Sequence, residues 1–252
     1  MAERVAVALA SGVLTLTLCR PEKRNAIDTA MIDALLHQLE RADLDQPVRV
    51  VALRGAGKDF CAGMDLEELL ASADRSAEEN ARSAMQFGSV FVRMREIPKP
   101  IVAVVHGRCL AGGAGLATAC DLIIAHPAAM FGYPEIQRGF VPAMVMTMLR
   151  RAVGEKIAFD LAATGRLLWA DEALRLGLIS RVLSADNFEQ EAAQLLTQLA
   201  GASASALALT KKQFYAIEGK AFGEAIRLGS EVNALSRSTP DFRTAIQRFL
   251  KK

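Results

Sequence analysis

Two short glycine-containing segments, far apart in the chain, constrain its fold more than any other feature. Residues 60–66 read FCAGMDL and residues 110–116 read LAGGAGL. Each follows an apolar run typical of a buried strand, at 48–54 and at 101–105, and each leads into a helix-like pattern. This repeated order predicts an α/β domain that contains at least two tight strand-to-helix turns.

The small residues in these turns also indicate a chemical role. A strand-to-helix turn of small residues leaves backbone N–H groups unpaired and lets a ligand approach the backbone closely. Such amides, together with the helix dipole, favour a negatively charged oxygen. Two turns of this kind side by side would form an oxyanion hole, which acyl-group chemistry requires. Ordinary connection geometry explains either turn taken alone, so other features of the chain have to decide.

The overall composition excludes several classes of protein. At 252 residues, 52% apolar and 23% charged, the chain is long enough for one large domain or for a core with an appendage. A net charge of +2 and scattered basic residues argue against binding to nucleic acid or to anionic membranes. The longest apolar stretch, 101–125, is interrupted by His106, Arg108 and Asp121, so we expect no membrane span.

The cysteines indicate a reducing compartment. Cys19, Cys61, Cys109 and Cys120 show no paired spacing and lie among apolar residues, so we expect reduced thiols in a cytoplasmic protein. The first residues, MAER, lack the charged-then-apolar layout of a signal peptide. The His106-x-x-Cys109 pair is a weak hint of a metal site, and no further zinc ligand follows at a workable spacing. We therefore expect no metal.

Periodicity and cap residues predict most of the secondary structure. Residues 5–10 and 13–18 should form a hairpin about Ser11-Gly12. Asp28 should cap one helix, and Ser76 with Glu79 should form a capping box for a longer helix that ends before Pro98. Further strands are expected at 122–125, 129–132 and 179–183, and further helices at 143–153, 155–163 and 170–176. Strands and helices in this order predict a spiral of β-β-α turns.

From residue 187 to the end the pattern is helical throughout, with apolar positions that include Phe214, Phe222 and Phe249. Residues 201–205 mark a junction. We divide the chain into a core at 1–195 and a C-terminal helical region at 196–252.

At this point five motifs, in order over residues 4–183, resemble the crotonase superfamily, the enoyl-CoA hydratases and isomerases. The motifs are RPEKRNA at 20–26, FCAGMDL at 60–66, HGRCLAGGAGL at 106–116 with Cys120-Asp121, FGYPE at 131–135, and TGR at 164–166 with Ala173 and Gly177-Leu178-Ile179. The resemblance implies a crotonase-like spiral with a C-terminal helical oligomerisation region. It also implies an acyl-CoA thioester substrate, no cofactor beyond the CoA of that substrate, and a homotrimer or hexamer.

The catalytic residues follow from the same resemblance. It assigns the oxyanion donors to the backbone amides of Met64 and Gly112, and the catalytic carboxylate to Glu135. Met64 stands where relatives often have alanine, and because only its N–H is used, this change should alter the acyl pocket rather than the hole. Asp65, Glu67 and Glu68 follow the first turn and also have the chemistry to act in the pocket, although a helix N-terminus favours acidic residues by itself.

The resemblance assigns CoA binding to four residues. Ala62 and Asp65 fall in the segment that lies against the adenine, and Lys23 and Arg24 match basic positions near the phosphates. A solvated surface pair explains Lys23 and Arg24 equally well.

The main departure from the family pattern is Gly115, where hydratases usually carry a second glutamate. One carboxylate, Glu135, can still move a proton between two carbons, as single-glutamate relatives do. Residues 141–146, VPAMVM, replace a glycine-rich stretch, and side chains there should crowd or reshape the place that a water needs, with Met144 and Met146 as candidates to fill the space beside Gly115. We therefore expect a Δ3,Δ2-enoyl-CoA isomerase. An enoyl-CoA hydratase and a catalytically impaired CoA-binding protein remain the alternatives.

Overall fold

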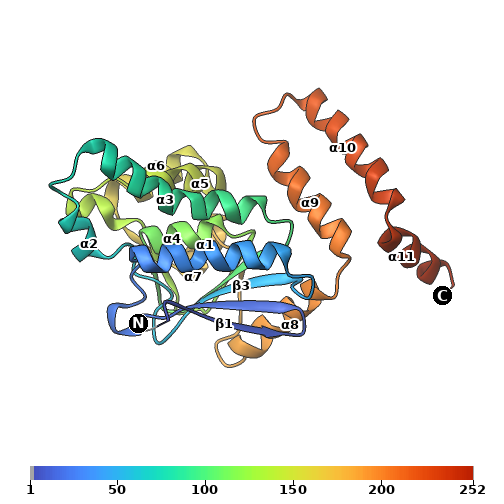
Figure 1. The fold of residues 1–252 in the computed structure, drawn as a ribbon, viewed down its shortest axis with the longest axis horizontal. Helices are drawn as coiled ribbons and strands as arrows, with labels where there is room; N and C mark the ends of the chain where they lie inside the picture. The colour runs from blue at the N-terminus through green and yellow to red at the C-terminus, as the bar shows by residue number, and fades with distance from the viewer. Residues whose placement is uncertain (1–2, 252) are drawn as a thin grey trace.

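The computed structural model describes residues 3–251, and a six-stranded sheet forms the centre of its core (Figure 1). The strand order is β1-β2-β3-β4-β6-β9, and only β1 and β2 pair antiparallel. The strands are β1 (Val5–Ala10), β2 (Val13–Leu18), β3 (Val50–Gly55), β4 (Ile101–Val105), β6 (Leu122–Ala125) and β9 (Arg181–Val182). The predicted hairpin is confirmed, and Ser11 and Gly12 turn it with φ of 50° and 79°. The last strand is shorter than the predicted 179–183.

Both faces of the central strands are buried, which explains their unbroken apolar sequences. Because successive side chains point to opposite faces, Val102 and Val104 of β4 pack in a cluster with α8 (Phe188–Ala200). Ala103 and Val105 belong to the larger cluster on the other face, which also contains side chains of α1 (Thr29–Leu44) and α3 (Ala77–Glu96).

The predicted caps of these two helices are confirmed. The Asp28 carboxylate accepts from the Met31 N–H at 2.8 Å. Ser76 and Glu79 form the reciprocal capping box that begins α3. The remaining core helices are α2 (Leu66–Ala71), α4 (Gly112–Ala119), α5 (Ala143–Val153), α6 (Glu155–Thr164) and α7 (Ala170–Arg175), with short 3-10 turns η1 (Pro21–Lys23) and η2 (Pro134–Arg138).

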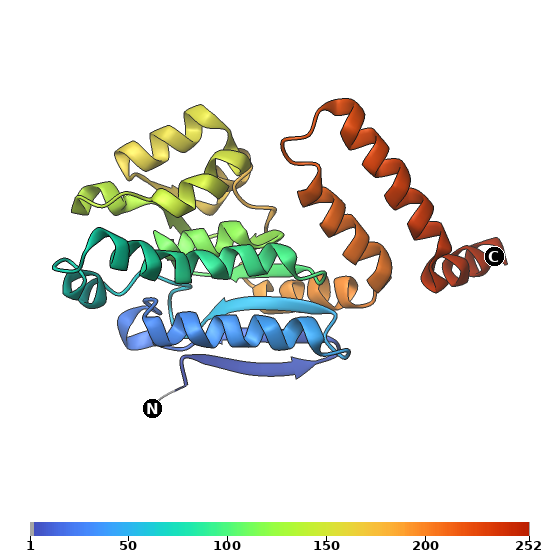
Figure 2. The same cartoon turned by 45° about the horizontal axis from the view of Figure 1, so that its top comes forward.

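A second, small sheet was only partly predicted. It has the order β5-β7-β8, made by β5 (Arg108–Leu110), β7 (Met130–Gly132) and β8 (Leu167–Trp169). Only β7 was expected from the sequence, because three-residue strands carry too little periodicity to be recognised. Each small strand follows or precedes a helix, so the chain forms the predicted spiral of β-β-α turns. Figure 2 shows the resulting layers, with β1 at the bottom and α5 and α6 at the top.

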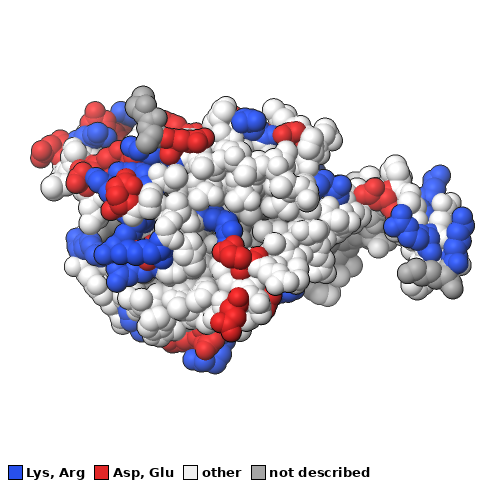
Figure 3. Space-filling view, turned by 90° about the horizontal axis from the view of Figure 1, so that it is seen from below, with Lys and Arg blue, Asp and Glu red and all other residues white. Residues whose placement is uncertain are grey.

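Beyond α8 the chain forms an arm of three helices, α9 (Ala204–Ala216), α10 (Phe222–Ser238) and α11 (Pro240–Leu250), which projects from the core (Figures 1 and 3). The boundary predicted between residues 195 and 196 falls inside α8. Leu196 and Ala200 still pack with the sheet, so the core extends to the end of that helix. Figure 3 shows acidic and basic side chains beside one another on the core. Within residues 3–251 no single helix has the length and apolarity of a membrane span, and α8 and α9 meet that test only jointly, across a bend of 97°.

A buried ion pair fastens the first helix of the arm to the core. The Lys211 ammonium lies 2.7 Å from Asp121 and donates to the carbonyls of Met94 and Lys99 at 2.8 and 3.0 Å. Burial lowers the pKa of Lys211, and the charge of Asp121 opposes that shift. The Tyr215 hydroxyl donates to the other Asp121 oxygen at 2.8 Å. This cluster explains why Lys211, although charged, is only 7% exposed.

Candidate active site

The first half of segment 60–66 is held against β5. Cys61 forms a parallel bridge with Cys109, in which its N–H donates to the Arg108 carbonyl at 3.1 Å and its carbonyl accepts from the Leu110 N–H at 2.9 Å. A β-carbon on Gly113 would lie 2.5 Å from the Cys61 carbonyl oxygen, so this close approach requires glycine. The two glycine-containing segments of the sequence are therefore in direct contact.

The second half of the same segment pairs with the chain on its other side. The Ile27 N–H donates to the Gly63 carbonyl, and the Asp65 N–H donates to the Ile27 carbonyl, both at 2.8 Å. These bonds use the groups on either side of Met64, so the Met64 N–H points away from Ile27. Among residues 3–251 that N–H has no acceptor.

The second turn places another unpaired amide beside the first. Ala111 has a φ of 50° and donates to the Gly132 carbonyl at 2.8 Å, and α4 begins at the next residue. The Gly112 N–H has no acceptor in the described chain, as is usual in the first turn of a helix. A β-carbon on Gly63 would lie 3.3 Å from the Gly112 nitrogen, and one on Gly112 would lie 3.5 Å from Cγ of Met64. The structure thus brings together the two predicted donors, Met64 and Gly112.

Glu135 is a buried carboxylate that follows the strand paired with the second turn. It lies in η2, three residues after the Gly132 whose carbonyl accepts from Ala111. The side chain is buried at 7% exposure, and its Oε2 has no hydrogen-bond partner among the described residues. Burial raises the pKa of Glu135, while a hydrogen bond from its own backbone amide and the charge of Arg138 partly lower it. A buried carboxylate with a free oxygen and a raised pKa has the properties of a proton-transfer group.

The acidic residues after the first turn are engaged elsewhere. The Asp65 carboxylate accepts from Arg20 at 2.8 Å and from the Glu67 N–H at 2.9 Å, which caps α2. Burial would raise the pKa of Asp65, but these hydrogen bonds bring it below its usual value. Glu67 pairs with Lys23 at 2.7 Å, and Glu68 accepts from the Thr29 N–H at 2.9 Å. None of these three carboxylates is left free in the way that Glu135 is.

The four residues assigned to CoA lie side by side at the edge of the first turn. The Ala62 N–H donates to the Arg24 carbonyl at 3.0 Å, and the Lys23 ammonium lies 3.4 Å from the Asp65 carboxylate. Lys23 and Arg24 have half-exposed side chains, at 39% and 48%. The hydrogen bond to Glu67 raises the pKa of Lys23. Asp65 acts structurally in this arrangement, through the buried Arg20, to which the sequence reasoning gave no role.

The space beside Gly115 is crowded by a side chain of segment 141–146, as expected, but the residue is Val145 and not one of the candidates Met144 and Met146. A β-carbon on Gly115 would lie 2.3 Å from Cγ1 of Val145 and 3.4 Å from Cζ of Phe91. Met146 is instead exposed, and the Met144 sulfur lies 3.2 Å from the β-carbon position of Gly88 on α3. Val145 is 4% exposed and β-branched, which leaves it a single preferred rotamer in a helix. The position of the family's second glutamate is therefore closed.

The cysteine side chains beside the two turns are buried. Cys61 and Cys109 are free thiols, and burial raises the pKa of Cys61 to about 12, so it stays protonated and unreactive. Among residues 3–251, no group of three or more His, Cys, Asp and Glu side chains is placed to hold a metal ion.

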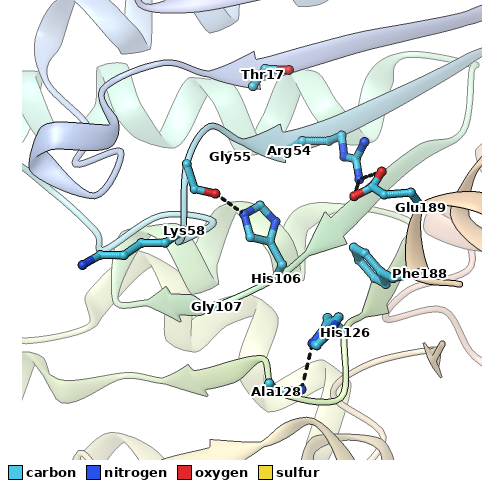
Figure 4. Close-up of a pocket in the computed structure, with 11 residues that line it drawn as sticks. Thr17, Arg54, Gly55, Lys58, His106, Gly107, His126, Ala128, Phe188 and Glu189 are labelled. Carbon is cyan, nitrogen blue, oxygen red and sulfur yellow. Dashed lines mark hydrogen bonds and ion pairs between the residues drawn. The ribbon is translucent and has the colours of Figure 1, made fainter. Parts of the chain in front are cut away.

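An open cleft of about 660 Å³ lies at the carboxyl ends of the central strands, next to the start of α8 (Figure 4). Its lining comprises Thr17, Arg54, Gly55, Gly57, Lys58, His106, Gly107, His126, Ala128, Phe188 and Glu189. No predicted site residue lines it. Arg54 is paired with Glu189 at 2.6 Å, and one nitrogen of His106 bonds to the Gly57 carbonyl at 2.9 Å. The polar groups of the cleft are thus largely satisfied locally, so the catalytic centre is better placed at the two turns and Glu135.

Comparison with known proteins finds relatives along most of the chain. Residues 8–252 match the family model described as enoyl-CoA hydratase/isomerase. A Thermus thermophilus protein assigned as an enoyl-CoA hydratase is 42% identical over 92% of this chain and 92% of its own length. The 1,2-epoxyphenylacetyl-CoA isomerase of Escherichia coli is 31% identical over 96% of this chain and 93% of its own.

Solved structures show the same architecture. The crystal structure of an enoyl-CoA hydratase from Mycobacterium smegmatis superposes with a TM-score of 0.95 at 31% identity, covering 99% of this chain and 97% of that one. The expected crotonase-like spiral with its helical C-terminal region is confirmed. The chain belongs to the enoyl-CoA hydratase/isomerase family.

Proposed function

We propose that this family member is a Δ3,Δ2-enoyl-CoA isomerase. The observation that carries the proposal is the contact between Gly115 and Val145, which closes the position of a second carboxylate and leaves Glu135 to work alone. A single carboxylate is sufficient for a double-bond shift, because the proton that it removes is the proton that it returns.

The proposed reaction proceeds through an enolate. The thioester oxygen of a 3-enoyl-CoA lies between the amides of Met64 and Gly112. Glu135 takes a proton from C2, and the C–H electrons move to that oxygen as negative charge develops. Each such donor contributes about 3 kcal/mol to transition-state stabilisation. The enolate then collapses, C4 takes the proton back from Glu135, and the double bond moves from C3–C4 to C2–C3.

The surroundings of Glu135 fit this shuttle. Burial raises its pKa towards that of a group that both accepts and returns a proton near neutral pH. Its free Oε2 leaves one oxygen available for the substrate.

We assign CoA binding to the edge of the first turn. Lys23 and Arg24 keep half-exposed cationic groups that suit the CoA phosphates. Ala62 and Asp65 hold the segment that the adenine lies against, the latter through its buried pair with Arg20. No cofactor other than the substrate's own CoA enters the proposal.

Enoyl-CoA hydratase is the second candidate, and the 42% identical Thermus relative favours it. In that reaction Glu135 would activate a water and then protonate C2. A catalytically impaired CoA-binding protein is the third candidate. Burial of a carboxylate with one oxygen left without a partner is costly, and the presence of such a group at Glu135 supports catalysis over binding alone.

The test compares the two reactions in the wild-type protein. The protein is incubated with 3-enoyl-CoA and, separately, with 2-enoyl-CoA, and products are read by mass spectrometry. Hydration adds the mass of one water, whereas isomerisation leaves the mass unchanged and is followed by chromatographic standards. With 3-enoyl-CoA deuterated at C2, a one-carboxylate shuttle carries part of the label to C4. Faster hydration than isomerisation would make the hydratase the better assignment, and no turnover of either substrate would favour the binding protein.

We also propose that the protein is a homotrimer or a hexamer. The arm carries large apolar side chains that a single chain leaves exposed, among them Phe214, Phe222 and Phe249 at 68%, 82% and 76%. Neither α10 nor α11 has a buried residue. Exposed apolar helix faces of this kind mark contact surfaces between chains.

A further inference from the structure

A fully buried asparagine ties the first turn to the loop that precedes α1. Asn25 is 0% exposed. Its side-chain nitrogen donates to the carbonyls of Ala56, Asp59 and Phe60 at 2.8, 2.8 and 3.1 Å, and its oxygen accepts from the Arg20 N–H at 2.9 Å. The side chain therefore binds the backbone immediately before the turn at three places.

The backbone at this asparagine is strained. Within residues 3–251 only four residues other than glycine have a positive φ, and they are Ser11, Arg24, Asn25 and Ala111. Ser11 is in the hairpin. Arg24 and Asn25, with φ of 52° and 55°, lie in the loop that pairs with the first turn, and Ala111, with φ of 50°, lies in the second turn. Such backbone conformations are unfavourable for residues other than glycine and persist where the surrounding structure requires them. Asparagine tolerates this region better than most residues, and its amide offers two hydrogens to the three carbonyls.

The consequence is visible at Met64. Backbone hydrogen bonds also join the two segments. The Ala62 N–H donates to the Arg24 carbonyl at 3.0 Å, and Ile27 donates to Gly63 and accepts from Asp65, both at 2.8 Å. With residues 24–27 held beside 62–65, the Met64 N–H points away from Ile27, and the second turn approaches the chain at the neighbouring Gly63.

We infer that Asn25 is a positioning residue for the first oxyanion donor. It acts through the backbone of residues 56–64 and does not touch the substrate. This inference rests on the oxyanion role of Met64 and Gly112 proposed above.

Two variants and a matched control test it. Asn25→Gly keeps the backbone conformation and loses the side-chain bonds. Asn25→Asp keeps the oxygen that accepts from the Arg20 N–H, but it replaces the donating nitrogen by a carboxylate oxygen that repels the three carbonyls. Lys99→Met is the control, because the Lys99 ammonium likewise donates to three carbonyls, those of Ala42, Asp43 and Asp45 at 2.6, 3.2 and 2.7 Å, away from the turns. All three variants lose a comparable three-carbonyl anchor and should lower the melting temperature.

Only the Asn25 variants should affect the donor. We expect kcat to fall by about 10- to 100-fold, less than the 100- to 1,000-fold typical for a lost donor, with KM changed by less than about threefold. The Lys99→Met enzyme should keep kcat within about twofold of wild type, as expected for an independent site.

A direct readout is the carbonyl stretch of bound butyryl-CoA, measured by infrared difference spectroscopy with a 13C label at C1. In the wild type, two amide donors should shift the stretch to lower frequency, and the Asn25 variants should lose part of that shift while Lys99→Met retains it. A full shift and normal kcat in Asn25→Gly would overturn the positioning role. Should Asn25→Gly fail to fold, the same result in Asn25→Asp would overturn it. Absence of any shift in the wild type would instead count against the oxyanion hole itself.

Discussion

Gly115→Ala is the smallest perturbation that tests the contact on which the functional proposal depends. The added methyl would lie 2.3 Å from Cγ1 of Val145, whereas carbon atoms in contact prefer about 3.5–4.0 Å. Relief would require more than an ångström of movement between α4 and α5, and the preferred rotamer of Val145 cannot supply it. Overpacking of this kind costs about 1–3 kcal/mol. The higher helix propensity of alanine returns about 1 kcal/mol, so we expect a net loss of up to about 2 kcal/mol in stability.

Val145→Ala should show the opposite defect. It removes two methyl groups from a site that is 4% exposed, a loss of about 1.6 kcal/mol at 0.8 kcal/mol per group, plus a cavity term. In the double variant the new methyl occupies the vacated space. We therefore expect a favourable coupling energy of about 1–3 kcal/mol.

The assay is a double-mutant cycle by denaturant unfolding, at one protomer concentration because assembly contributes to apparent stability. If the two single effects add to within about 0.5 kcal/mol, the two side chains do not compete for one space and the reasoning is wrong. The Val145→Ala variant also allows a functional test. Gly115→Glu alone should be unstable or inactive, while Gly115→Glu with Val145→Ala should gain hydration of 2-enoyl-CoA. A stable, hydrating single variant would refute the steric account.

Three further outcomes are expected. Glu135→Gln should lower kcat by about 100- to 10,000-fold with little change in KM, measured by isomerisation kinetics, and full activity would remove Glu135 from the mechanism. Because burial raises the pKa of Glu135 in the folded state, its ionisation weakens folding as pH rises through that pKa. Hence the melting temperature of Glu135→Gln minus that of the wild type should be larger at pH 7 than at about pH 4, near the usual glutamate pKa. An equal difference at both pH values would show that ionisation of Glu135 does not destabilise the folded protein. Light scattering at micromolar concentration should give three or six times the 27.1 kDa of one chain, and a monomer would contradict the assembly proposal.

The sequence predicted what depends on local pattern. Asp28 and the capping box at Ser76 are where their spacing placed them, because a cap needs only residues within one helical turn. The contact of Val145 with Gly115 was missed, since neighbouring residues of a helix point in different directions and only packing sets which one faces α4.

Contacts across long sequence separations were also beyond local pattern. Arg20 and Asn25 lie 45 and 34 residues from the Asp65 and Asp59 groups that they bind. Both residues belong to the RPEKRNA motif, which is recognisable in the sequence, but their hydrogen-bond partners become known only from the folded structure. The burial of Glu135, which gives the carboxylate its chemistry, likewise depends on elements from across the chain.

The ion pair between Lys211 and Asp121 determines where the protein can be shortened. Separating the two would leave a buried charge without its partner, which costs about 3 kcal/mol or more. By this measure α9 belongs with the core although its sequence reads as part of the tail. Within residues 3–251 the last ion pairs to the core are those of Glu218 with Arg95 and Arg151, and the next residue, Gly219, has a φ of 72° and open space around it. A chain cut after Gly219 should therefore fold and fail to assemble, whereas one cut after Ala202 should lose stability as well. Equal melting temperatures for the two truncated proteins would show that the pair does not hold α9.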